Sequence, residues 1–232
     1  MNSNYASSSG RAGVLVWDWP LRVFHWLLVI CVAGAWATHY AGLEWFEWHR
    51  RLGYATLVLV AFRVVWGFVG TRYARFGSFV RGPRAIAEYV ASLRSSAAAP
   101  AGHNPLGALS VIAFLAVLLV QAATGLFAND EVANAGPFFG WVSQETSNQL
   151  TSIHHLNSNV LLGLIAVHLL AVVYYDVMRR SGLTRALLTG RKQRVEGIEG
   201  SRGVLALIIV ALLAVALALA IRAAPEATIS FF

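Results

Sequence analysis

Two histidines, His154 and His168, stand fourteen residues apart within one long apolar stretch of the chain. Fourteen steps of ~100° leave two side chains about 40° apart on one helix face, and a rise of ~1.5 Å per residue separates them by about 21 Å. That distance is most of the ~30 Å hydrocarbon core of a bilayer. Imidazole is a good ligand for haem iron. The spacing therefore predicts two haem sites, one near each membrane surface, with a path for electrons between them.

Histidines on two other apolar stretches complete two ligand pairs. With helices that alternate in direction across the membrane, His25 reaches the depth of His168, and His49 reaches the depth of His154. We therefore predict an inner haem held by His25 and His168 and an outer haem held by His49 and His154. Two histidines on one iron fill both axial positions, which favours electron transfer over activation of oxygen.

His39 is a rival for the outer ligand, because it also follows another histidine by fourteen residues. Spacing alone leaves the choice between His39 and His49 open. His155 points ~100° away from its neighbour His154, so we expect it at the interface or against a haem propionate or a quinone. His103 is expected where a helix begins at the inner surface.

Two arginines are predicted to bind the propionates of the inner haem. Arg63 follows His49 by fourteen residues, and therefore shares its helix face at the inner depth. A lone charge inside a membrane is costly, and a guanidinium can bind a carboxylate through two hydrogen bonds. Arg22, one turn before His25, is the second candidate. The alternative for Arg63 is that its long side chain reaches the membrane surface.

The elements that must position these residues are five apolar stretches. Each has about the ~20 residues that a spanning helix needs once the second and fourth are extended back to His49 and His154. The stretches are Leu21–Ala41, Leu52–Val69, Leu106–Phe127, Val160–Met178 and Val204–Ile221. We therefore predict an all-α integral membrane protein. It consists of a flexible cytoplasmic N-terminus (1–15), a di-haem four-helix bundle (16–191), and a basic linker with a fifth, C-terminal transmembrane helix (192–232).

Composition and charge agree with this class. The chain is 57% hydrophobic and 12% charged, with a net charge of +7, and a soluble domain carries about twice that charged fraction. Arginines precede the first stretch and fill the loops after the second and fourth, whereas the other two loops are mostly acidic. The positive-inside rule then predicts a cytoplasmic N-terminus and an external C-terminus, rather than a nucleic-acid-binding surface. The single cysteine, Cys31, excludes covalent attachment of haem through C-x-x-C-H, so any haem is of b type.

Three motifs resemble those of the prokaryotic cytochrome b561 family, whose members include the cytochrome b subunits of nickel–iron hydrogenases and formate dehydrogenases. The run from Trp17 to Trp26, WDWPLRVFHW, is similar to the family's entry motif. His49-x-x-x-Gly53 with Arg63 resembles its second-helix motif. The stretch from His154 to His168 resembles its fourth-helix ligand pair, although His155 stands where relatives often have an acid.

The resemblance covers about residues 16–191 and implies a four-helix core with two b haems. It also favours His49 over His39 as the outer ligand. Members of the family pass electrons between membrane quinone and a redox partner. We therefore expect a protein of the bacterial inner membrane, with ubiquinone or menaquinone as substrate and a periplasmic c-type cytochrome as partner. If this chain itself exchanges electrons with the quinone, it has quinol or quinone oxidoreductase activity. Assembly into a homo-oligomer stays open.

Two other functions compete with this interpretation. The first is a haem-bearing membrane anchor subunit of a hydrogenase or dehydrogenase, which the fifth helix and the long loop 129–152 would suit. The second is a metal-ion transporter that uses the same histidines as ligands. The wide separation of His154 and His168 along one helix argues against a compact metal site and so disfavours a transporter.

Overall fold

The computed structural model describes residues 13–92, 104–132, 134–192, 196–198 and 200–225. Within these residues, five helices are long and apolar enough to cross a membrane. They are α1 (Trp19–Tyr40), α2 (Phe46–Val69), α5 (Pro105–Gly125), α6 (Gln144–Val173) and α8 (Gly203–Ala223). The prediction of an all-helical membrane protein with five spans is confirmed.

Polar side chains set where three of the spans begin. Asp18 caps α1 by accepting a hydrogen bond of 2.8 Å from the backbone N–H of Leu21. Asn104 caps α5 in the same way, and Pro105 fits the first turn of that helix because its missing N–H would have no partner there. Ser143 caps α6. As a result α6 begins ten residues before His154, well ahead of the apolar stretch from which it was predicted.

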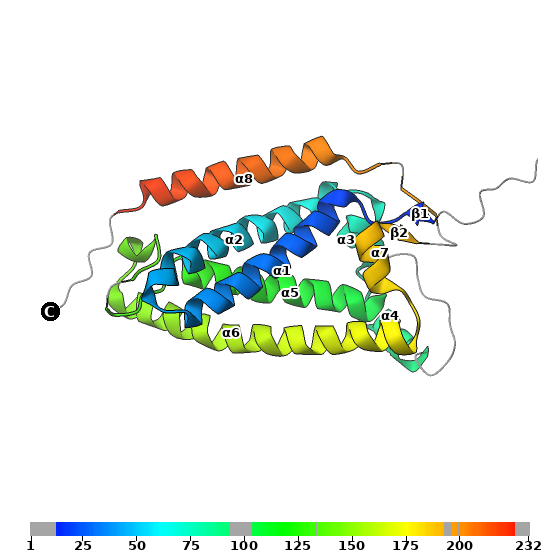
Figure 1. Cartoon of the computed structure of the whole chain (residues 1–232), viewed down its shortest axis with the longest axis horizontal. Helices are drawn as coiled ribbons and strands as arrows, with labels where there is room; N and C mark the ends of the chain where they lie inside the picture. The colour runs from blue at the N-terminus through cyan, green and yellow to red at the C-terminus, as the bar shows by residue number, and fades with distance from the viewer. Residues whose placement is uncertain (1–12, 93–103, 133, 193–195, 199, 226–232) are drawn as a thin grey trace, which may run out of the picture.

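The long helices form two packed pairs with one helix outside them (Figure 1). α1 packs on α2, α5 packs on α6, and the two pairs meet where α2 contacts α5. α8 lies outside this group of four and packs mainly on α2. In contrast, α6 packs closely only on α5 among the long helices, so the faces of α1 and α2 that carry the predicted ligands meet α6 across a loosely packed interface.

Short elements gather at one end of the bundle, which we call the arginine end (Figure 1). They are α3 (Phe76–Phe79), α4 (Pro83–Ser92), α7 (Leu183–Thr189), β1 (Val14–Leu15) and β2 (Arg191–Lys192), with a 3₁₀ turn at Arg72–Ala74. The opposite end, which we call the histidine end, carries 3₁₀ turns at Leu43–Trp45 and Phe139–Trp141. The basic loops named above therefore lie at the arginine end.

The antiparallel pair of β1 and β2 was not predicted. It pairs Val14 with Lys192 and Leu15 with Arg191, and the backbone N–H of Ile198 donates to the carbonyl of Leu15 at 2.8 Å. The start of the chain is thereby tied to the segment that leads into α8. The predicted flexibility of the N-terminus falls largely on residues 1–12, which lie outside the described residues, as does His103.

The helical path of α6 continues beyond the last residue of its regular α-helical hydrogen bonding, Val173. A π-helical turn, Tyr174–Met178, continues it at the arginine end. Within this turn, Asp176 accepts hydrogen bonds from the backbone N–H groups of Leu183 (2.5 Å) and Thr184 (2.9 Å). These contacts satisfy free donors at the start of α7 and fix that helix against the end of α6.

Candidate haem-binding sites

His49 and His154 face each other at the histidine end, from α2 and α6. Their ring centroids lie 6.3 Å apart with an angle of 77° between the ring planes. Two imidazoles that share one metal ion through bonds of ~2 Å place their centroids about 6 Å apart. The observed separation therefore fits one iron between the two rings.

Backbone carbonyls hold both of these rings in place. His49 Nδ1 lies 2.8 Å from the carbonyl oxygen of Ala35 on α1, and His154 Nδ1 lies 2.9 Å from that of Gln121 on α5. A carbonyl only accepts, so Nδ1 of each ring carries the proton and Nε2 is unprotonated, with a lone pair that can bind a metal. A metal-binding histidine usually donates its other N–H in this way, which fixes both tautomer and orientation.

The side chain of Gln121 forms a second contact with His154. Its amide nitrogen lies 3.0 Å from His154 Nε2, and its carbonyl oxygen accepts a 2.7 Å hydrogen bond from Asn157. Gly125, one turn further along α5, makes room for the same ring: a Cβ at this position would lie 2.9 Å from His154 Cε1. Thus α5, which contributes no predicted ligand, shapes the position of His154.

His39 and His155 extend the cluster toward the surface. The ring of His39 lies 5.8 Å from that of His49 and 6.0 Å from that of His155, centroid to centroid. Both His39 and His155 are exposed, and neither ring forms a hydrogen bond with another described residue. Because His49 is half-buried and held by a carbonyl, it is better prepared than His39 to bind iron.

His25 and His168 form the second pair, on α1 and α6. They are close enough to interact electrostatically. His168 packs edge-on against Phe114 of α5, with ring centroids 5.3 Å apart. His25 Nδ1 is buried and has no hydrogen-bond partner among the described residues. A buried imidazole nitrogen without a partner costs free energy, so this ring is suited to a ligand that is not part of the chain.

Arg63 lies deep between α2 and α3, near the same end. Its side chain is 2% exposed, and its guanidinium carbon lies 5.1 Å and 5.9 Å from the ring centroids of Phe76 and Phe79. Both terminal nitrogens, Nη1 and Nη2, are buried without a hydrogen-bond partner among the described residues. A buried guanidinium with two free donors suits a carboxylate such as a haem propionate.

Asp18 is the anionic counterpart of Arg63 and is fully buried. Besides capping α1, it accepts hydrogen bonds from Trp66 Nε1 at 3.1 Å and from Thr71 Oγ1 at 2.6 Å. These contacts join the start of α1 to the end of α2. The carboxylate also interacts electrostatically with Arg63, so it offsets part of the cost of burying that charge.

Arg22 is only partly available to a ligand. Its Nη1 donates to the backbone carbonyl of Leu188 at 2.5 Å, which ties α1 to the end of α7. Its Nε is buried without a partner among the described residues. Gly190, with a positive φ of +76°, lets the chain turn tightly against Arg22 and Trp17 at this point. The structure therefore gives Arg22 a structural contact that its spacing from His25 did not reveal.

These observations together fit b haem at both ends of the bundle. The histidine end offers two oriented imidazoles, and Gly53, one turn after His49, has nothing within 4 Å of the position of a Cβ. The arginine end offers buried polar groups that lack a partner. The loose interface between α6 and the α1–α2 pair lies between the ligands of each pair.

Comparison with known proteins agrees with this geometry. The model of the family described as prokaryotic cytochrome b561 matches residues 16–190. The chain belongs to this family. It is a helical membrane protein of the cytochrome b class, and b haem is accordingly its cofactor. The matched region contains α1, α2, α5 and α6 and stops before α8.

Several relatives of this b561-family cytochrome are described as B-type cytochrome subunits of Ni/Fe hydrogenases. A probable Ni/Fe-hydrogenase B-type cytochrome subunit of Rhodobacter capsulatus is 26% identical over 215 residues, which are 78% of this chain and 82% of the relative. Proteins of the same description from Rhizobium leguminosarum bv. viciae (26% identical, 78% and 90% covered) and, for hydrogenase 1, Escherichia coli K12 (22%, 78% and 92%) also match. No solved structure matches significantly.

Three residues of the cytochrome's sites were missed by the sequence analysis: Asp18, Gln121 and Gly125. Asp18 and Gln121 are polar residues beside or within apolar stretches, and that is a signal the sequence does contain. Residue spacing could not predict the hydrogen-bond partners of these side chains, since Asp18 binds residues 48 and 53 positions away in the sequence. A glycine within an apolar stretch, such as Gly125, does not by itself indicate that a ligand ring lies against it.

Proposed function

We propose that this b561-family cytochrome carries electrons across the membrane through two b haems, between membrane quinone and a redox protein on the far side. The inner haem is held by His25 and His168 and the outer one by His49 and His154. The observation that carries the proposal is the His49–His154 pair, with centroids 6.3 Å apart and each Nδ1 at a backbone carbonyl.

Each residue has a definite part in this function. The four imidazoles would hold the two haem irons, two imidazoles to each iron, and such a ligand set favours electron transfer over activation of dioxygen. The carbonyls of Ala35 and Gln121 keep the outer rings in the neutral, Nδ1-protonated form that binds iron through Nε2. Arg63, and secondarily Arg22 through its Nε, neutralise the propionates of the inner group. When bound, b haem supplies one-electron oxidation and reduction.

The proposed orientation follows from the loops. The arginine end, with α3, α4 and α7, faces the cytoplasm, and the histidine end faces the periplasm across the bacterial inner membrane. An example of the surface charge at the arginine end is Arg72, which pairs with Glu196 at 2.5 Å. The carboxylate of Glu196 raises the pKa of the Arg72 guanidinium further above the physiological range, where arginine is always charged.

A reduced-minus-oxidised spectrum of the purified full-length protein, with haem counted per chain, tests the ligand assignment. Two b-type haems per chain are expected, and addition of a quinol should reduce them without dithionite. One haem per chain would refute one of the two pairs. Two haems that no quinol reduces would leave the ligands intact and refute quinone as the donor.

A second function is favoured by the relatives' descriptions, which name subunits of Ni/Fe hydrogenases. In that case the same haems would serve as the membrane anchor of a hydrogenase or dehydrogenase, and the partner would replace the c-type cytochrome. Purification of the tagged protein from its own host decides between the two. A stoichiometric metalloenzyme subunit supports the anchor, and a haem-loaded protein without one supports the carrier.

The metal-ion transporter is not supported. Among the described residues, no group of three or more histidine, cysteine or acidic side chains could hold a metal ion. Two imidazoles alone would leave two of the four positions of a tetrahedral ion such as zinc to water.

A further inference from the structure

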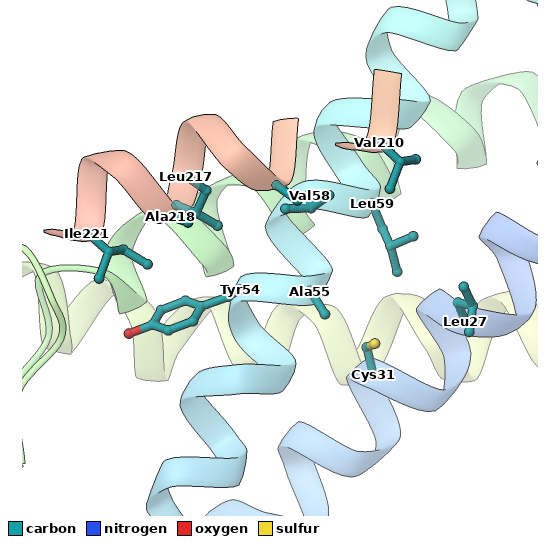
Figure 2. Close-up of a pocket in the computed structure, with 11 residues that line it drawn as sticks. Leu27, Cys31, Tyr54, Ala55, Val58, Leu59, Val210, Leu217, Ala218 and Ile221 are labelled. Carbon is teal, nitrogen blue, oxygen red and sulfur yellow. The ribbon is translucent and has the colours of Figure 1, made fainter. Parts of the chain in front are cut away.

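A groove lies between α8 and the faces of α1 and α2 that are turned toward α8 (Figure 2). Its volume is about 460 Å³, and apolar side chains of the three helices line it. It lies within membrane-crossing segments, and its α8 wall lies outside the family region, because α8 follows residue 190. It is therefore a feature of this chain's extra helix rather than of the haem sites.

The two halves of α8 differ, and this difference creates the groove. The first half is held close: a Cβ on Gly203 would lie 2.6 Å from the ring of Trp19, and Arg202 Nη1 donates to the carbonyl of Val69 at 3.0 Å. Ala206 is accordingly buried. The second half presents the small side chains of Ala214 and Ala218 to the groove, and these do not reach far enough to fill it.

The length of the groove matches one leaflet of a bilayer. Its wall on α8 runs from Val210 to Ile221, a rise of about 16 Å, or roughly half of a ~30 Å hydrocarbon core. A transmembrane helix would continue through the other leaflet, whereas this groove ends within one. Its length and apolar lining suit a single acyl chain.

Among the described residues that line this groove, only Cys31 and Tyr54 carry a polar side-chain atom, and Tyr54 stands at its surface end. Figure 2 shows the hydroxyl of Tyr54 turned toward the end where Ile221 lies. Arg222 follows Ile221 in the last turn of α8 and is exposed. Neither side chain has an ion pair or hydrogen bond to another described residue. One hydroxyl and one unpaired cation at the membrane surface complement a phosphate with a negative charge.

We propose that the groove binds one anionic phospholipid, whose acyl chain lies between α2 and α8 and whose phosphate is bound by Arg222 and Tyr54. The lipid fills the space that Ala214 and Ala218 leave and fastens the free half of α8 to the haem-bearing bundle. This proposal does not depend on the haem ligands. It adds a lipid site at the histidine end of the molecule.

Native mass spectrometry of the haem-loaded full-length protein tests the site. The protein in detergent is titrated with dioleoylphosphatidylglycerol and, separately, with dioleoylphosphatidylcholine. We expect one tightly held phosphatidylglycerol, with binding at least about tenfold weaker, or ~1.4 kcal/mol, in the double variant Ala214→Leu/Ala218→Leu. Arg222→Gln should remove the preference for phosphatidylglycerol over phosphatidylcholine while the acyl chain still fits.

Ala216→Leu is the matched control, because it makes the same change on the same helix about 200° away from Ala214, at an exposed position. It should bind lipid as the unaltered protein does, and all variants should keep the same haem spectrum. Equal lipid binding in the double variant and in Ala216→Leu would overturn the proposal. Retention of a quinone in place of phospholipid, or a change from dimer to monomer in the double variant alone, would also overturn it.

Discussion

The two ends of the bundle satisfy their buried polar groups in different ways. At the histidine end, His49 and His154 already donate to backbone carbonyls, and Gln121 contacts the remaining nitrogen of His154. At the arginine end, His25 Nδ1 and both terminal nitrogens of Arg63 are buried without a partner among the described residues. The first site is prepared by the chain itself, whereas the second depends on a bound group to complete it.

This contrast has an energetic consequence. An unsatisfied buried donor costs ~1–3 kcal/mol, and more if it is charged. The apoprotein therefore bears its main cost at the arginine end, where Asp18 offsets only part of the charge of Arg63. Binding of a haem with its propionates at that end should stabilise the fold more than binding at the histidine end.

The largest expected effect comes from removal of one ligand at each end. His154→Ala should remove the outer haem alone, and His168→Ala the inner haem alone, so that each variant keeps about half of the haem. His39→Ala is the control at the histidine end, since His39 is exposed and lacks a carbonyl partner. Haem counted per chain is the measurement. Loss of one haem in His39→Ala but not in His49→Ala would reverse our choice of the outer ligand.

A smaller effect is expected from the charges at the arginine end. In a region of effective dielectric ~20, a unit charge about 10 Å away shifts the redox equilibrium by about 1.7 kcal/mol, or roughly 70 mV for one electron. Arg63→Gln should lower the potential of the inner haem, because a nearby cation favours the reduced form. Asp18→Asn should raise it.

A redox titration followed in the visible spectrum measures both haems in these variants. The potential of the outer haem serves as the internal control. It should equal that of the unaltered protein within experimental error, since the outer ligand His154 lies about 20 Å along α6 from the inner ligand His168. Shifts of the same sign in Arg63→Gln and Asp18→Asn would contradict the electrostatic explanation and indicate a general loss of structure at the arginine end.

The comparison also shows which parts of the site the sequence can reveal. Alternating helix directions placed His49 at the depth of His154, because spanning helices are regular. The spacing of fourteen left His39 as a rival, and the family resemblance favoured His49. The start of α6 at Gln144 did not follow, since a polar first third of a helix has no apolar pattern. The bonds of Asp18 to Trp66 and Thr71 depend on packing between distant residues, which spacing does not encode.

A third, smaller effect concerns the glycines near the outer ligands. Gly125→Ala places a methyl group 2.9 Å from His154 Cε1, so the ring or α5 must move. We expect a weakened outer haem and a changed outer potential, with the inner haem unaffected. Gly53→Ala meets nothing within 4 Å in the chain itself, so it should leave the stability of the apoprotein unchanged and reduce outer haem binding only if porphyrin occupies that space. Haem content and apoprotein melting temperature measure the two effects separately.

The smallest effect on stability should come from substitution of Gln121, and its size should differ between the apoprotein and the haem-loaded protein. In the chain alone, Gln121 contacts His154 Nε2 and accepts from Asn157, so Gln121→Leu should destabilise the apoprotein by about 1 kcal/mol. Once Nε2 binds iron, it no longer accepts that hydrogen bond, and only the contact with Asn157 is left to lose. The same substitution should therefore lower the melting temperature less in the haem-loaded protein than in the apoprotein. An equal loss in both forms would mean that Gln121 acts through Asn157 and the packing of α5 on α6, and that it does not hold the ligand ring in readiness for iron.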